Sequence, residues 1–127
     1  MFRCKTMFAS VAILAVGAVF AIAPATSLAG RVGGALFVKG YAGPDDYESY
    51  TVRFEGGKMA HVFVKSIHRT DLDVKIIDPV TLQVVAQDLR AAKDAHVDFF
   101  PTKTREYIIL VHNYNRDRGS AYVLRTN

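Results

Sequence analysis

The sequence predicts an all-β fold, an antiparallel β-sandwich of about eight strands that follows an N-terminal signal peptide. Two observations carry this prediction. Short segments alternate between apolar and polar residues, which is typical of strands with one buried face. Turn signals rich in Gly, Pro, Asn and Asp separate these segments roughly every eight to twelve residues. A small closed barrel is the alternative arrangement of the same strands.

Residues 1–29 have the composition of a secretory signal peptide. Arg3 and Lys5 precede an apolar run over residues 7–23, and small residues stand where a signal peptidase reads, which predicts cleavage after Ala29. The alternative is an uncleaved anchor, but a run of about 17 residues is at the lower limit of a membrane span. We therefore expect a secreted or periplasmic protein.

Residues 30–127 are predicted to form one β-sandwich domain. The chain's single cysteine, Cys4, lies in the signal, so an apolar core must stabilise this domain without a disulfide. The domain carries 14 basic and 12 acidic side chains, a net charge of +2, and these charges are interspersed. Nucleic acid is a poor partner for such a charge pattern.

Residues 70–78 give the clearest strand, and we expect it to be central in its sheet. Asp78-Pro79 ends it, since proline cannot donate to a strand ladder. The apolar side of this strand consists of Leu72, Val74 and Ile76, and the polar side, predicted to face solvent, of Asp71, Asp73 and Lys75.

The remaining strands follow from the same alternation. Residues 106–113 are apolar on both faces, which predicts a second central strand covered on both sides. Gly56-Gly57 predicts a hairpin between two neighbouring segments, and residues 41–49 are predicted to be a turn-rich loop. The further strands are expected at residues 35–39 (an edge strand), 50–55, 59–66, 82–86, 95–100 and 121–125.

Between residues 46 and 124, the order of strands resembles the bacterial pre-peptidase C-terminal domain, a β-sandwich attached to many secreted peptidases. The segments that carry the resemblance are 50–54 followed by Gly57, 71–79, Phe100-Pro101, 107–111 with Asn113, and 119–124. This sequence departs from the family pattern because no glycine precedes Tyr107 and because these 127 residues do not include a peptidase domain. The resemblance implies a non-catalytic sandwich that binds or presents a partner outside the cytoplasm.

Carboxylates are the first set of side chains that could carry chemistry. Asp71 and Asp73 share one strand face and Asp78 ends that strand, so a calcium site of these three residues is one hypothesis. No calcium-loop signature is present, and the alternative interpretation is a soluble strand face with a turn-forming aspartate. No other cofactor is expected.

Histidines and nucleophiles give no clear site. His61, His96 and His112 lie on predicted strands, but they are scattered, which favours hydrogen-bonded histidines over a zinc site. Serines lie in no nucleophile-elbow context. We therefore do not expect an enzyme.

Aromatic residues provide the candidate binding site. Tyr41, Tyr47 and Tyr114 lie beside Gly, Asp and Asn, as in the rims of peptide- or sugar-binding sites; alternatively they cap the ends of the sandwich. The leading hypothesis is an exported, non-enzymatic binding or accessory module for a protein or an extracellular polymer. The alternative is a self-associating structural envelope protein that docks through edge strands, with residues 31–40 as that edge.

Overall fold

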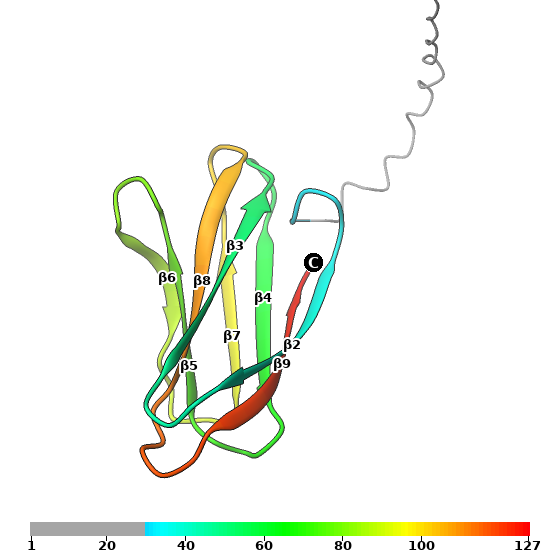
Figure 1. Cartoon of the computed structure of the whole chain (residues 1–127). Helices are drawn as coiled ribbons and strands as arrows, with labels where there is room; N and C mark the ends of the chain where they lie inside the picture. The colour runs from blue at the N-terminus through cyan, green and yellow to red at the C-terminus, as the bar shows by residue number, and fades with distance from the viewer. Residues whose placement is uncertain (1–29) are drawn as a thin grey trace, which may run out of the picture.

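The computed structural model describes residues 30–127, and the predicted signal peptide, residues 1–29, lies outside the described residues. Within residues 30–127 no helix is long and apolar enough to cross a membrane. This part consists of antiparallel strands (Figure 1): β2 (Leu36–Ala42), β3 (Tyr47–Phe54), β4 (Ala60–Ser66), β5 (Leu72–Ile77), β6 (Val84–Asp88), β7 (Asp94–Phe99), β8 (Arg105–Asn113) and β9 (Ser120–Thr126).

The strands form two four-stranded sheets, which confirms the all-β sandwich and not the closed barrel. Sheet I has the strand order β2-β9-β4-β7, and sheet II has the order β3-β8-β5-β6. The predicted edge strand is β2, at one edge of sheet I, and the two strands predicted to be central, β5 and β8, occupy the middle of sheet II.

The core lies between the sheets and is built from the apolar side of each alternating strand. In β5, Leu72, Val74 and Ile76 are completely buried, as the sequence predicts. In β8, by contrast, the outward Ile108 and Leu110 are only half-buried, because no described element covers this face of sheet II. The other fully enclosed apolar side chains are Ala42, Phe54, Ala60, Val62, Val64, Ile109, Val111, Tyr122 and Leu124.

The predicted hairpin at Gly56-Gly57 is wrong. The connection carries the chain from β3 in sheet II to β4 in sheet I, so its two flanking strands are not paired with each other. The amide of Gly56 donates to Thr104 Oγ1 and the amide of Gly57 donates to the carbonyl of Pro101, at 2.9 and 2.8 Å. The β7–β8 loop thus holds the turn. The two strands that flank the turn contribute their apolar sides to the core from opposite sheets.

Candidate functional site

Two of the three candidate tyrosines meet at one end of sheet II. Tyr47 stacks on the His112 ring with centroids 4.2 Å apart and an interplanar angle of 12°, and Tyr114 meets the same ring edge-on at 4.0 Å. Both tyrosines stay about half exposed, at 53% and 51%. His112 therefore joins them into an aromatic cluster, the His112 cluster, that solvent still reaches.

Tyr41 lies apart from the His112 cluster. It belongs to β2 of sheet I, where it covers Gly119, whereas Tyr47 begins β3 of sheet II. The predicted loop over residues 41–49 is thus mostly strand, and only residues 43–46 connect the two sheets. This crossover between sheets separates the two side chains.

An acidic side chain completes the His112 cluster. Asp45 Oδ1 lies 3.1 Å from His112 Nε2, and its other oxygen is 4.0 Å from Arg116 Nε. Asp45 adopts a positive φ of 50°, which aspartate tolerates better than most residues. The connection between the sheets therefore places a carboxylate beside the imidazole.

Asp71 and Asp73 lie at the same end of sheet II, with Asp73 directly opposite His112 in the β5–β8 ladder. The prediction that Asp73 faces solvent is wrong. Its side chain points away from the core, but the residue is only 5% exposed, because neighbouring side chains cover this part of the sheet. Burial raises the pKa of the Asp73 carboxyl, and the Asp71 charge raises this pKa further. The Oδ1 atoms of both residues are buried without a hydrogen-bond partner among residues 30–127.

Asp78 does not join these two carboxylates. It lies at the opposite end of β5, roughly 16 Å along the strand from Asp73. Its Oδ1 accepts hydrogen bonds from the amide of Val80 and from Arg105 Nη2, at 2.8 and 3.2 Å, and the Val80 bond is the main reason that its pKa is lowered. Asp78 therefore holds the β5–β6 turn.

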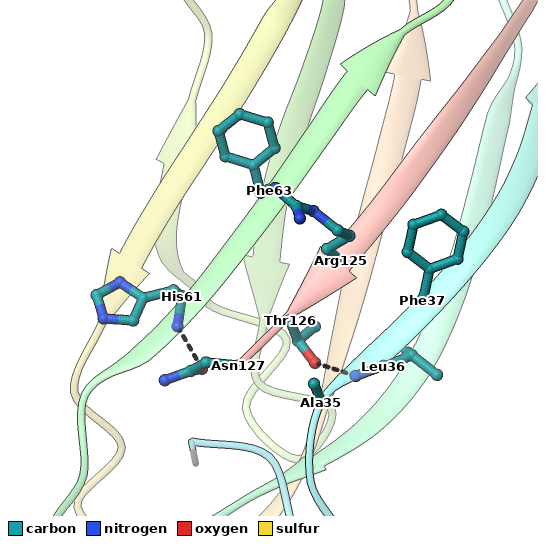
Figure 2. A pocket seen from close by; sticks show the side chains of 8 residues that line it. All are labelled: Ala35, Leu36, Phe37, His61, Phe63, Arg125, Thr126 and Asn127. Atoms are coloured by element: carbon teal, nitrogen blue, oxygen red, sulfur yellow. Dashed lines mark hydrogen bonds between the residues drawn. The ribbon is translucent and has the colours of Figure 1, made fainter. Parts of the chain in front are cut away.

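A groove of about 370 Å³ lies on the outer face of sheet I, at positions that the sequence analysis did not select (Figure 2). Phe37, Arg125 and Phe63 are neighbours across β2, β9 and β4 in the ladder, and the Arg125 guanidinium lies 5.4 Å from the Phe63 ring centroid. Phe37 is 61% exposed. The available signal was the presence of phenylalanines on the solvent side of two alternating strands.

The structure also brings together two of the scattered histidines. His61 of β4 and His96 of β7 lie on the outer face of sheet I beside Asp98, while His112 is on sheet II. Sequence spacing hid this cluster, because His61 approaches Asp98 only through the β4–β7 pairing.

The serines have structural roles where their contacts are described. Ser66 Oγ lies 3.0 Å from both Thr70 Oγ1 and Ser120 Oγ, and Thr70 also bonds Ser120. All three residues are buried, so these hydroxyls satisfy one another within the fold and offer no accessible nucleophile.

The fold and these surfaces define a small β-sandwich with exposed aromatic sites. No family model matches this sequence, and no curated protein matches it. Several solved structures share the fold, and two of them are informative here. One is the pre-peptidase C-terminal domain of collagenase from Bacillus anthracis, with a TM-score of 0.61 and 17% identity, over 72% of this chain and 88% of that one. The resemblance inferred from the sequence is thereby confirmed as a likeness of fold.

The second structure is PliG from Aeromonas hydrophila, described as a periplasmic lysozyme inhibitor of g-type lysozyme. It has a TM-score of 0.54 and 14% identity, over 73% of this chain and 84% of that one. At these identities the two structures share the fold with this chain.

Proposed function

We propose that this chain is an exported, non-enzymatic binding module that captures a protein with an acidic surface through the groove of sheet I. The observation that carries this proposal is the row of Phe37, Arg125 and Phe63 across three strands, in which Phe37 and Arg125 are exposed and Phe63 is partly buried. Aromatic and arginine side chains supply most of the binding energy at protein interfaces. The predicted signal peptide and the fold likeness to an accessory domain and to an inhibitor agree with this role.

Charge favours an acidic partner. Arg125 and Lys65 line the groove and its continuation along the sheet, whereas no aspartate or glutamate side chain of the described residues does so. Lys39 lies in the same row as Lys65, separated from it by Val123. Complementary charge on a partner would speed encounter and set its orientation, while the phenylalanines would be buried.

Photo-crosslinking in the exporting cell tests this proposal. A photoreactive phenylalanine analogue at Phe37 should give one discrete protein adduct, and the same analogue at Phe100 should not, because Phe100 is similarly exposed but lies outside the groove. Arg125→Glu should abolish the Phe37 adduct by reversing the charge. Equal crosslinking at both positions, or none at either, would overturn the proposal. g-Type lysozyme, which the structural neighbour PliG inhibits, is the first purified probe.

The His112 cluster favours a second candidate, binding of an extracellular polymer. Tyr47 and Tyr114 are held by one imidazole and present half-exposed rings, which suits stacking against a sugar or proline ring. Sedimentation with isolated cell-wall polysaccharide separates the two candidates. Tyr47→Ala should release the protein from the polymer, whereas Phe63→Ala should not.

Self-association remains the alternative class of function. β2 pairs only with β9 and leaves its other edge free among the described strands, so it could accept a strand from a second copy. Sedimentation velocity over a wide concentration range measures this directly. A monomer at every concentration would exclude the structural envelope role and leave the binding module.

A further inference from the structure

We propose that His61, His96 and Asp98 form a three-ligand site for a divalent zinc ion on the outer face of sheet I, with the fourth coordination position open to solvent. His61 also lines the groove, so this site adjoins the partner site proposed above, but the zinc proposal does not rest on that partner. The ligand set, two imidazoles and one carboxylate, is one that zinc prefers, and three protein ligands with one open position is the usual arrangement of accessible zinc sites.

The β4–β7 ladder creates the cluster. His61 lies directly opposite Asp98, and His96 is two residues before Asp98 on the same outward face. Directly opposite residues of antiparallel strands have side chains about 5 Å apart, and diagonal neighbours are within reach of an imidazole. The three side chains are about half exposed, so an ion can enter from solvent and the rings can adjust.

The distances between ligand atoms suit a small ion. Asp98 Oδ1 lies 2.6 Å from His61 Nδ1 and 2.8 Å from His96 Nε2, and all ligand atoms are within 4.8 Å of one another. In a tetrahedral zinc site, ligands about 2.0–2.1 Å from the metal are roughly 3.4 Å from each other. The ligand atoms therefore need to move by less than roughly 1 Å to admit the ion.

Without metal, the Asp98 oxygen accepts hydrogen bonds from both imidazoles, and these contacts lower the pKa of Asp98. A zinc ion would take the place of the hydrogen atoms in these two contacts: each imidazole would carry its hydrogen on its other ring nitrogen, and the nitrogen facing Asp98 would bind the metal together with the Asp98 oxygen.

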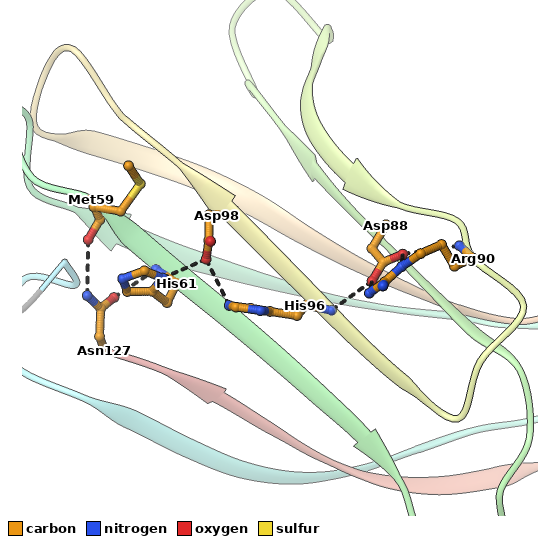
Figure 3. Close-up of polar contacts among 7 residues, drawn as sticks. All are labelled: Met59, His61, Asp88, Arg90, His96, Asp98 and Asn127. Atoms are coloured by element: carbon orange, nitrogen blue, oxygen red, sulfur yellow. Dashed lines mark hydrogen bonds and ion pairs between the residues drawn. The ribbon is translucent and has the colours of Figure 1, made fainter.

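The backbone around the cluster is fixed by side-chain hydrogen bonds (Figure 3). The amide of His61 donates to Asn127 Oδ1 at 2.9 Å, and the amide of His96 donates to Asp88 Oδ2, also at 2.9 Å. Asp88 is in turn held by Arg90 at 2.6 Å, which keeps the Asp88 pKa far below its usual range. These contacts hold the ligand-bearing strands in place, and only the side chains need to move.

A cluster of ion pairs that never binds metal would have the same geometry in the metal-free protein. The test must therefore measure zinc binding directly. Isothermal titration of the purified, metal-free protein with zinc chloride at pH 7.5 should show one site per chain. His61→Gln and His96→Gln should each weaken this binding by more than about 100-fold, because losing even an outer-sphere partner typically weakens a metal site about 10- to 100-fold.

His68→Gln is the matched control, since His68 is an exposed histidine in the β4–β5 connection, remote from this cluster. It should bind zinc as the parent does. Calcium should not compete, because imidazole nitrogen is a poor calcium ligand. Ring resonances of His61 and His96, but not of His68 and His112, should shift when zinc is added.

Three results would overturn the proposal: no zinc binding by the parent, undiminished binding in both glutamine variants, or equal loss in the His68 control. Melting of each variant without metal verifies folding, and because both substituted side chains are exposed we expect no change in Tm. Crosslinking at Phe37 reports separately on the partner site, so failure of one proposal leaves the other open to test.

Discussion

The hydroxyl groups of Tyr50 and Tyr122 lie 2.6 Å apart and join the two sheets through the core. Tyr50 belongs to β3 of sheet II and Tyr122 to β9 of sheet I. Tyr122 is completely buried, and this burial raises the pKa of its hydroxyl. The two strands, β3 and β9, each bring a hydroxyl group into the apolar interior, and the bond between these hydroxyls helps to fix the position of one sheet relative to the other.

Removing either hydroxyl should destabilise the protein, and by unequal amounts. Tyr122→Phe should cost about 1 kcal/mol, the net value of a typical hydrogen bond, because the remaining Tyr50 hydroxyl is only partly buried. Tyr50→Phe should cost about 1–3 kcal/mol, because it leaves the buried Tyr122 hydroxyl unpaired. Urea unfolding of both variants measures the difference; a smaller loss for Tyr50→Phe would contradict this account.

A charge at Val74 should unfold the domain. This side chain is completely buried in the middle of sheet II, and Val74→Asp would place a carboxylate among apolar neighbours, at a cost of about 4 kcal/mol or more. Thr51→Asp is the control, since Thr51 has a similar shape but faces solvent on β3. Circular dichroism should show a melting transition for the control alone. A parent-like melt of Val74→Asp would contradict the assignment of the faces of β5.

Among the polar residues at the end of the sandwich where β8 ends, Asn113 should be the one whose substitution lowers the free energy of unfolding most. Its fully buried side-chain nitrogen donates to the carbonyls of Ala42, Gly43 and Arg118, at 3.3, 3.0 and 2.9 Å. It thereby links the end of β8 to the β2–β3 connection and to the β8–β9 turn. Asn113→Asp replaces this donor by an oxygen that faces three acceptors. We expect a loss of about 3 kcal/mol or more in the free energy of unfolding, measured with urea.

Asn115→Ala is the control for this prediction, because Asn115 accepts hydrogen bonds from the amides of Asp117 and Arg118 in the exposed part of the same turn. Its loss should cost about 1 kcal/mol or less. Comparable losses at the two asparagines would show that the turn, and not the buried amide, dominates stability at this end.

The raised pKa of Asp73 predicts that its contribution to the free energy of unfolding falls as the pH rises. Folding raises its pKa above the ordinary value of 3.8, so the folded protein holds this proton more tightly than the unfolded chain does. The free-energy penalty of holding an ionised Asp73 in the folded protein is absent below pH 3.8, grows as the pH rises from there, and is complete above the folded pKa. Asp73→Asn should therefore raise the Tm at pH 7 and leave it nearly unchanged near pH 3. The same Tm difference at both values would refute this.

Calcium gives the same pair of aspartates a second test. We propose that Asp71 and Asp73, whose Oδ1 atoms are buried without partners, supply part of a calcium shell, while Asp78 takes no part. Added calcium should then raise the Tm of the parent and leave that of Asp73→Asn unchanged, with Asp78→Asn behaving as the parent does toward calcium. No shift with the parent would refute a calcium site at these two carboxylates.

Strand faces are the part of this fold that local sequence predicts well. The alternation in residues 70–78 placed Leu72, Val74 and Ile76 in the core, and the same pattern placed Val62 and Val64 of β4 there. It misjudged Asp73, since alternation tells which side a residue faces but not how much its neighbours cover it. It also did not identify Gly40, where an added methyl group would overlap the Tyr50 and Tyr122 side chains.

The sequence by itself determined the short amphipathic strands, the turns at their ends and the class of fold, because these depend on residues that are adjacent or two apart. Only the tertiary structure decided which strands pair. That pairing places His61 against Asp98, aligns Phe37 with Arg125 and Phe63, and sends Tyr41 and Tyr47 to different sheets. Strand pairing is non-local: it is selected by the joint burial of two apolar sheet faces, which no short stretch of sequence contains.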